Sequence, residues 1–153
     1  MSVQPNSLIR WSLLLSVLLT LHNPVLAQED GTVRIELSGL AEAQGNVYIA
    51  VYDSEDSWLG EDTVLQRKVA IAEALDGDFV LAELQLPAGE YAVSIYYDIN
   101  GNGDLDTNWI GIPKEPVALS NNARNRFGPP KYKDAVFTLG AETVVQKISI
   151  ESM

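Results

Sequence analysis

The sequence predicts an all-β protein, an antiparallel sandwich of seven strands. Two observations carry this prediction. Apolar and polar residues alternate with a period of two in most of seven segments, as in strands that bury one face. No segment makes a convincing amphipathic helix. Short strands of this number and pattern are typical of two antiparallel sheets packed face to face.

The expected strands follow one another along the chain with turn residues between them. The first two contain Val33 to Leu37 and Val47 to Val51. A third run, about 67–74, fits either a helix or a strand. Asp76-Gly77 is a hairpin signal that favours antiparallel strands on both sides. The remaining strands are expected at 79–86, 91–97, 135–139 and 144–150.

Residues 1–27 have the organisation of a signal peptide. Arg10 is the single charge, an eleven-residue apolar run follows it, Pro24 breaks the run, and Ala27 ends a stretch suited to cleavage. Eleven residues are too few to span a bilayer, which takes about 20. A membrane anchor is the weaker alternative. We therefore expect an exported protein, periplasmic or secreted, whose mature part is one domain of residues 28–153 without a membrane span.

The composition of the mature part excludes several functions. It carries all 21 acidic residues and 10 − 1 = 9 basic ones, so its net charge is 9 − 21 = −12. Such a charge repels nucleic acid and anionic membranes. Cysteine is absent, and the one histidine, His22, falls in the predicted leader. Ser-His-Asp catalysis, Cys-His catalysis and a conventional zinc site are therefore not expected. We predict a protein that is not an enzyme.

The segment DINGNGDLD, from Asp98 to Asp106, predicts a calcium-binding loop. A glycine, Gly103, stands at position 6, and oxygen-bearing side chains stand at positions 1, 3, 5 and 9. This is the opening of the twelve-residue EF-hand loop, in which the carbonyl of position 7 is a further ligand. An ordinary Asn/Asp/Gly-rich turn is the alternative. The expected ligands are Asp98, Asn100, Asn102, Asp104 and Asp106.

The predicted calcium shell needs ligands from outside this loop. Position 12 is Trp109 where an EF-hand has a bidentate Glu, and calcium takes six to eight oxygens. Water, Glu115, or Asp53 and Asp56 are the candidate sources. The last two follow the second strand, so they would meet the loop if the two strands run in the same direction. With two acidic side chains among the loop's own side-chain ligands, we expect a modest dissociation constant of about 10⁻⁴ to 10⁻³ M.

The segment from Thr107 to Lys133 is a long ordered loop in this prediction. It has 27 residues, four prolines and five of the nine mature cations, against one acid. Loops of this length in compact domains are usually functional or disordered, and its apolar residues favour order. Either it folds over the acidic loop through ion pairs, or it binds an anionic ligand. The second case predicts a pocket lined by Trp109, Phe127 and Arg124 or Arg126.

The aromatic residues of the strands have structural interpretations. Tyr91, two residues after Gly89, fits a tyrosine corner, and a plain Pro-Gly turn with a core tyrosine is the alternative. Trp58 is expected to cap an open end of the core. For four other tyrosines we expect packing against neighbouring strands rather than a surface on which sugars stack. They are Tyr48, Tyr52, Tyr96 and Tyr97.

Four ordered blocks carry a resemblance to a known family. They are VYIAVYD at 47–53, LPAGEYAVSIYYDINGNGDLD at 86–106, GIPKE at 111–115 and SNNARNRFGPP at 120–130. Together they resemble an exported bacterial family catalogued as domain of unknown function 2141, from about residue 31 to the end. The resemblance implies a transthyretin-like or immunoglobulin-like Greek-key sandwich. It implies no established activity, substrate or catalytic residue.

Three functions compete on this sequence. The leading hypothesis is a non-enzymatic, calcium-stabilised module whose long loop meets an envelope component, a glycan or a protein. The second is a carrier of a small anionic ligand, which requires a cavity beneath the long loop. The third is a hydrolase that uses calcium-bound water, which requires an open coordination position beside a carboxylate.

Overall fold

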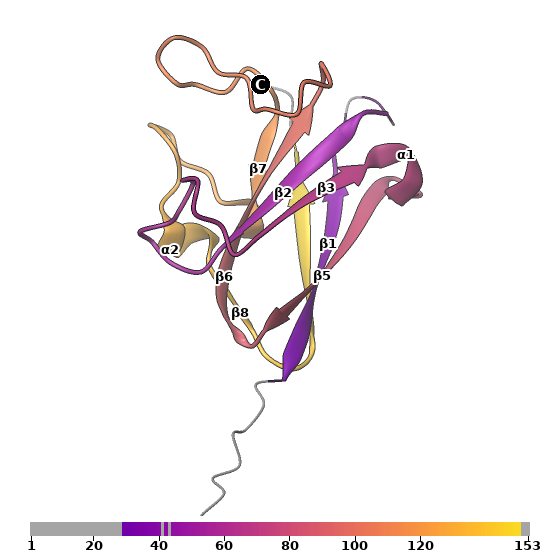
Figure 1. The fold of residues 1–153 in the computed structure, drawn as a ribbon, viewed down its shortest axis with the longest axis vertical. Helices are drawn as coiled ribbons and strands as arrows, with labels where there is room; N and C mark the ends of the chain where they lie inside the picture. Colours follow the sequence, from indigo (N-terminus) through magenta and orange to yellow (C-terminus); the bar gives the residue numbers. More distant parts are fainter. Residues whose placement is uncertain (1–28, 41, 43, 151–153) are drawn as a thin grey trace, which may run out of the picture.

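The computed structural model describes residues 29–40, 42 and 44–150, and strands dominate it (Figure 1). The predicted leader lies outside these residues. No helix in the described part is long and apolar enough to cross a membrane. The strands are β1 (Asp30–Ser38), β2 (Asn46–Tyr52), β3 (Leu65–Ala70), β4 (Leu75–Asp76), β5 (Phe79–Pro87), β6 (Gly89–Asp98), β7 (Val117–Leu119), β8 (Phe137–Leu139) and β9 (Thr143–Ser149). Short helical segments are α1 (Ile71–Ala74), η1 (Ser120–Asn122) and α2 (Tyr132–Ala135).

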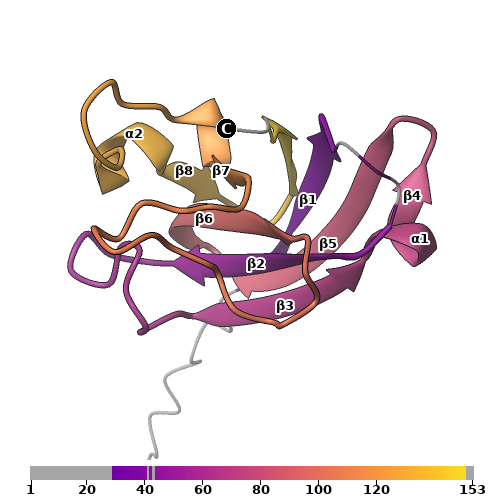
Figure 2. The same cartoon turned by 90° about the horizontal axis from the view of Figure 1, so that it is seen from above.

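The strands form two sheets that face each other (Figures 1 and 2). One sheet has the order β4-β5-β1-β9, and the other has the order β3-β2-β6-β7, with β8 pairing the start of β6. The prediction of an all-β, two-sheet sandwich is therefore confirmed. The prediction that every pair is antiparallel is wrong, because β1 and β9 are parallel. Nothing local sets the relative direction of two strands that come from opposite ends of the domain.

The period of two decides which face of each strand is buried. Val33, Ile35 and Leu37 of β1 point inward with at most 1% of their surface exposed, while the residues between them are half-buried. Strands β2, β5 and β6 repeat the pattern, and their inward side chains form one core between the sheets. Burial of each such aliphatic side chain contributes roughly 1.5–3 kcal/mol, which makes this core the main stabilising term.

The described residues contain nine strands rather than the seven expected. The additional strands are β4 and β7, with two and three residues, which are too short to show a periodic pattern. The third run, about 67–74, for which the sequence allowed either a helix or a strand, contains one of each. Strand β3 ends at Ala70, and helix α1 follows it directly. The hairpin signal at Gly77 is confirmed by the pairing of Asp76 with Phe79. Its first strand is only β4, since β3 belongs to the opposite sheet.

The long segment from Thr107 to Lys133 is not one loop. Strand β7 interrupts it and pairs antiparallel with β6, from Tyr96↔Val117 to Ser94↔Leu119. Because β6 runs toward the acidic loop, β7 carries the chain away from that loop. The second half of the segment therefore lies beside the turn after β2, and the expectation that it folds over the acidic loop is wrong for this half.

Aromatic contacts fix the second half of the segment. The indole Nε1 of Trp58 donates to the carbonyl oxygen of Pro130 at 2.9 Å. Its ring meets those of Tyr52 and Tyr132 edge to face, with centroids 5.2 and 5.9 Å apart. Tyr52 lies on the face of β2 opposite the core residues Val47, Ile49 and Val51, so Trp58 packs on the outer face of this sheet and does not cap the core as expected. Nearby, the Tyr91 hydroxyl donates to the Pro87 carbonyl at 3.0 Å, which confirms the tyrosine corner.

The tripeptide Ser120-Asn121-Asn122 joins three parts of the fold. The buried Ser120 hydroxyl accepts from the Val93 amide at 2.9 Å and donates to the Ala135 carbonyl at 2.6 Å. Asn122 donates to the Lys147 carbonyl and accepts from the Ser149 amide, so its side chain occupies part of the edge of β9. Both asparagines have positive φ, a conformation that Asn tolerates better than most residues.

Replacement of Ser120 by Ala is expected to destabilise the protein by about 1–3 kcal/mol, because it leaves a buried amide and a buried carbonyl without partners. Ser38→Ala is the matched control, since that hydroxyl makes only a long bond of 3.4 Å. Urea unfolding of both variants measures the difference. Equal losses would show that the Ser120 bonds do not join these elements.

Candidate metal site

The acidic loop leaves the end of β6 and returns to β7 (Figure 1). Asp98 is the last residue of β6, and Asn46 of β2 lies opposite it. Beyond the loop, the chain forms a narrow ribbon in which Thr107 pairs with Pro113 and the Lys114 amide donates to the Asp106 carbonyl at 2.8 Å. The strand register therefore holds both sides of the loop's base.

Asp98 shapes the loop from within. Its side chain is 1% exposed. One carboxylate oxygen accepts from the Gly101 amide at 2.7 Å, and the other accepts from the Gly103 amide at 3.0 Å. Both glycines have positive φ, which residues with a Cβ rarely adopt, so the two amides can turn inward. The first predicted ligand thus lies at the centre of the loop.

Three further predicted ligands converge on one another. The side-chain nitrogen of Asn100 donates to one Asp106 carboxylate oxygen at 2.6 Å, and that of Asn102 contacts the other at 3.4 Å. The side-chain oxygens of the two asparagines accept from the Asn102 and Asp104 amides. Positions 3, 5 and 9 therefore share one interior. Asp104 joins this network through its backbone amide.

Glu115 joins the two ends of the loop. Its side chain is 4% exposed, one carboxylate oxygen accepts from the Ile99 amide at 2.9 Å, and the other accepts from the Asp106 amide at 3.1 Å. The structure therefore brings Glu115 to the loop, as expected for an additional ligand. Its observed contacts are those of a clamp that sets the distance between the first and last residues of the loop.

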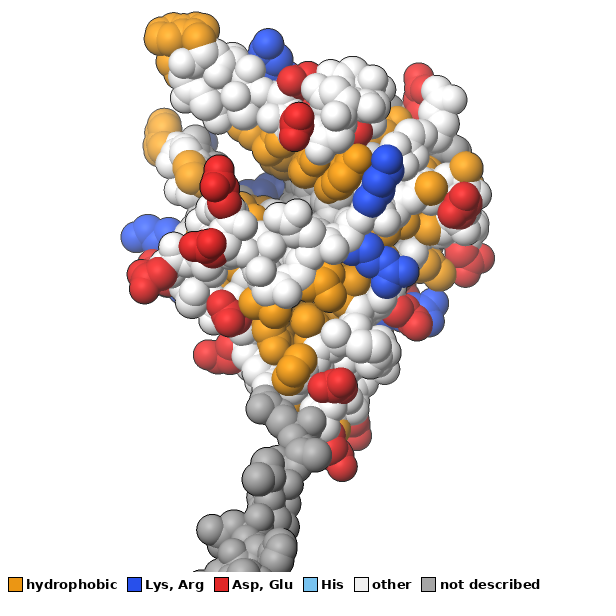
Figure 3. Space-filling model, in the orientation of Figure 1, with side chains coloured by type: hydrophobic (Ala, Val, Ile, Leu, Met, Phe, Trp, Pro, Cys, Tyr) orange, Lys and Arg blue, Asp and Glu red, His pale blue; other side chains and the backbone are white. Residues whose placement is uncertain are grey.

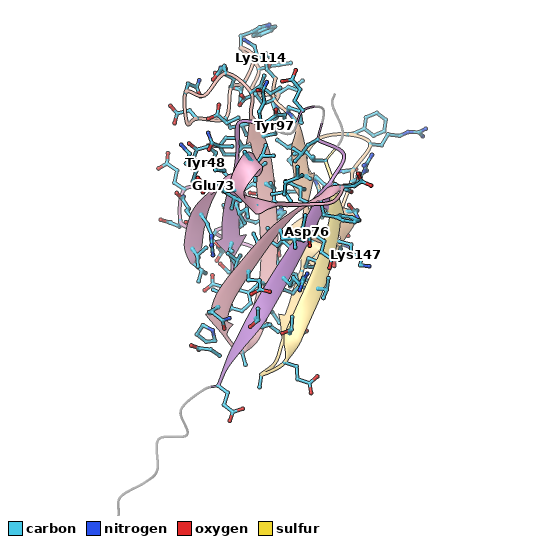
Figure 4. All side chains as sticks on the ribbon, turned by 90° about the vertical axis from the view of Figure 1, so that its right-hand side faces the viewer. Tyr48, Glu73, Asp76, Tyr97, Lys114 and Lys147 are labelled. Atoms are coloured by element: carbon cyan, nitrogen blue, oxygen red, sulfur yellow. The ribbon has the colours of Figure 1, made fainter. Side chains whose placement is uncertain are left out.

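The two buried carboxylates have no cationic partner within the described part of the chain. The ion pairs found there join Arg34 and Lys147 to Glu36 and Glu83 on the other sheet. Figure 4 shows the position of Lys147. Buried charges without a counter-charge are costly even when they are hydrogen-bonded. In the part of the chain that the structure describes, no three Asp, Glu, His or Cys side chains lie close enough together to hold a metal ion by themselves. A cation here would depend on asparagine and carbonyl oxygens as well.

Tyr96 supports the loop from the outer face of the sheet. Its hydroxyl donates to the Gly103 carbonyl at 2.7 Å, and its ring stacks on Tyr48 with centroids 4.9 Å apart. Burial, and then the nearby ionisable groups of Tyr48, Asp98, Asp104 and Glu115, raise the pKa of Tyr96 to about 12. The stacked pair confirms cross-strand packing for these two tyrosines. The rise in pKa follows first from burial of the hydroxyl and then from the ionisable groups around it, three of which are carboxylates.

Asp53 and Asp56 do not belong to this site. Strands β2 and β6 are antiparallel, so Asp53 lies seven residues along β2 from Asn46, the partner of Asp98. At about 3.3 Å per residue the separation is roughly 23 Å. The expectation that these acids complete the calcium shell is wrong. Asp53 instead lines an open depression of about 510 Å³ together with Glu61 and Asp62.

The residues expected to line an anion pocket are surface residues. Trp109 is 93% exposed and Phe127 is 85% exposed, on separate turns, and Arg124 and Arg126 are exposed beside Phe127. Trp109 occupies position 12 of the loop, where an EF-hand has its bidentate glutamate, and its side chain points to solvent. The structure therefore brings together the residues predicted as calcium ligands, but not those predicted to line an anion pocket.

Sequence reasoning missed two roles that the structure shows. Tyr96 was assigned to packing alone, although its hydroxyl also holds the loop. The edge-covering role of Asn122 was not anticipated. Two consecutive asparagines, which favour positive φ, were the local signal for the second role.

The fold and site together define a β-sandwich with an oxygen-rich loop that two buried carboxylates hold in place. The chain belongs to the bacterial family described as "uncharacterized protein conserved in bacteria" (DUF2141), whose model matches residues 35–147. That range includes the whole loop, Glu115 and Ser120 to Asn122. No curated protein and no solved structure gives a significant match.

Glu115→Gln is expected to destabilise the protein by about 1–3 kcal/mol, because an amide nitrogen then faces a backbone N–H that has lost its acceptor. Hydrogen exchange at the Ile99 and Asp106 amides should accelerate. Glu73→Gln, at an exposed position on α1 (Figure 4), is the matched control. Unchanged exchange at both amides would contradict the clamp.

Stability is expected to fall as the pH rises from about 10 to about 12. An unfolded tyrosine loses its proton near pH 10, whereas the pKa of Tyr96 in the folded chain is about 12. Between these values the unfolded state binds fewer protons, so this contribution is complete below pH 10 and is lost as the pH approaches 12. Urea unfolding at several alkaline pH values measures the slope, which should be shallower in Tyr96→Phe.

Proposed function

We propose that the protein is an exported, non-enzymatic β-sandwich whose loop Asp98–Asp106 binds calcium, and that it serves as an interaction module in the envelope or outside the cell. The observation that carries the proposal is the pair of buried carboxylates, Asp98 and Glu115, which no described cation neutralises. A divalent ion at the loop would offset the cost of burying both charges.

The chemistry of the loop suits a hard cation. Asp98 and Asp106 supply carboxylate oxygens, and Asn100 and Asn102 supply amide oxygens. The oxygens of Asp98, Asn100 and Asn102 accept from backbone amides, those of Asp106 accept from the two asparagine side chains, and each oxygen keeps a free lone pair. Calcium prefers oxygen ligands of this kind and completes its shell with carbonyls and water. Glu115 acts on the site by holding Ile99 and Asp106 together. Few acidic ligands give a modest affinity, as expected for a stabilising ion.

Export and fold type belong to the same proposal. The leader at 1–27 supports export, and family membership supports a bacterial protein. The two facing sheets, with β1 between β5 and β9, support a transthyretin-like or immunoglobulin-like Greek key. The carrier and the hydrolase receive no specific support. Trp109 and Phe127 face solvent rather than a pocket, and backbone amides already engage the oxygens of Asp98 and Glu115.

Calcium titration of residues 28–153 tests the proposal by calorimetry and thermal melting. Saturable binding is expected, and about 10 mM calcium should add roughly 1.4–2.7 kcal/mol of stability for a dissociation constant of about 10⁻³ to 10⁻⁴ M. Asp98→Asn and Asp106→Asn should weaken binding. Asp53→Asn and Asp56→Asn, at the other end of the sandwich, are matched controls and should not.

Tyr96 provides an independent readout of the ion. Its pKa is raised in part by Asp98, Asp104 and Glu115, so a bound dication should lower it. Tyrosine absorbance during an alkaline titration, with calcium and with a chelator, measures this change. Absence of binding heat, of a melting shift and of any change in the titration would reduce the loop to an elaborate turn.

A further inference from the structure

Two turns carry hydrophobic side chains that are largely exposed to solvent. One is Asn108 to Gly111 (NWIG), and the other is Asn125 to Gly128 (NRFG). Trp109 and Ile110 in the first are 93% and 56% exposed, and Phe127 in the second is 85% exposed. Single exposed hydrophobic residues are ordinary, but two aromatic rings displayed in this way on matching turns are not. We call these segments the NWIG turn and the NRFG turn.

The NWIG turn is built to be rigid. The Asn108 amide donates to the Ile112 carbonyl at 2.8 Å, and the Gly111 amide donates to the Asn108 carbonyl at 3.0 Å. The Asn108 side-chain oxygen accepts from the Ile110 and Ile112 amides, each at 3.0 Å. Gly111 has a φ of 81°, which a residue with a Cβ rarely adopts. The indole is therefore held outward by a braced backbone.

The NRFG turn is also braced by the side chain of its asparagine, here mainly as a donor. The Asn125 side chain donates to the Phe127 carbonyl at 3.1 Å and to the Pro129 carbonyl at 3.4 Å. Gly128 has a φ of 81°, the same value as Gly111. The bond from Trp58 to Pro130 fixes the far side of this turn to the sandwich. A hydrophobic side chain held outward in this way gives up little conformational entropy when it is buried by a partner.

Both turns project from the same side of the molecule (Figures 1 and 2). In Figure 3, hydrophobic side chains form the outer ends of two separate protrusions at the upper left. Exposed cations flank the tips in sequence: Lys114 follows the NWIG turn, Arg126 lies within the NRFG turn, and Lys131 follows it. Lys114 lies at the loop-bearing end of the molecule (Figure 4). Exposed cations therefore accompany the NRFG turn, whereas the NWIG turn has Lys114 close to the acidic residues Asp104, Asp106 and Glu115.

We propose that the NWIG and NRFG turns insert together into the interfacial region of a lipid bilayer. Indole and phenyl rings favour that region, and neighbouring Lys and Arg side chains attract lipid phosphates. Because each turn is a narrow protrusion, its hydrophobic side chain can enter between lipid headgroups. A protein partner would need a continuous complementary surface of about 800 Å² on each side. The net charge of −12 of residues 28–153 opposes the approach of the rest of the domain to an anionic surface, so contact is confined to the tips.

This inference deepens the proposed function by naming the partner as a lipid surface. It does not require calcium, because asparagine side chains rather than an ion brace the two turns. The two proposals also have separate readouts. Calcium binding is read from heat and melting, whereas lipid contact is read from the environment of Trp109.

Tryptophan fluorescence with lipid vesicles tests the inference on residues 28–153, which contain both sheets and all of the described core. Within this range only Trp58 and Trp109 contribute. Trp58 is already packed against Tyr52 and Tyr132, so a shift of emission to shorter wavelength on adding vesicles reports Trp109. Vesicles of phosphatidylcholine, with and without phosphatidylglycerol, are compared in calcium and in chelator.

A blue shift together with co-sedimentation is expected with both kinds of vesicle, because the two rings enter the interfacial region of either bilayer. Removal of both rings in Trp109→Ser/Phe127→Ser should reduce partitioning about 10-fold or more, read by co-sedimentation. Phe79→Ser/Val145→Ser removes two residues of 41% and 44% exposure on the other sheet and should leave partitioning unchanged. Partitioning that survives loss of both rings would overturn the proposal. Unchanged emission with every vesicle would also overturn it and would assign the tips to a protein partner.

Discussion

Two buried carboxylates hold the loop-bearing end of this sandwich together through the hydrogen bonds that they accept from four backbone amides. Asp98 draws the Gly101 and Gly103 amides into the loop, and Glu115 joins its first and last residues. Hydrogen bonds to charged groups contribute about 1.5–3 kcal/mol each, more than neutral ones. Without Glu115, the ribbon that carries the NWIG turn would lose its fixed position relative to β6.

The same constraint creates the chemistry of the site. Placing carboxylates at the base of the loop gathers negative charge where the sheet ends, and this charge adds to burial in raising the pKa of Tyr96. A hard cation is the natural complement to that charge. On the opposite side of the fold, hydrogen bonds between uncharged groups hold the chain in place. Ser120 to Asn122 and Trp58 fix the second half of the long segment through hydroxyl, amide and indole bonds, and this places the NRFG turn.

Much of the fold and part of the site could be predicted, because their signals are local. The alternation at Val33, Ile35 and Leu37 specifies one buried face without reference to any other strand. The spacing of oxygens from Asp98 to Asp106 likewise predicts a loop with a shared interior. The error at Asp53 came from an assumption about strand direction, which no local pattern contains. The parallel pairing of β1 with β9 escaped prediction for the same reason.

The sequence by itself determined the two-sheet class, the loop with its oxygen-bearing side chains and membership of the family, whereas the hydrogen bond from Tyr91 to Pro87 decided between a tyrosine corner and a plain turn. Each of these depends on residues close together in the chain, where periodicity, glycine and side-chain chemistry act directly. Only the tertiary structure decided that Glu115 would close the loop, that Asp53 would lie at the far end, and that two asparagine-braced turns would project from one side. Those outcomes depend on strand order and direction, which follow from how the two sheets bury their shared core.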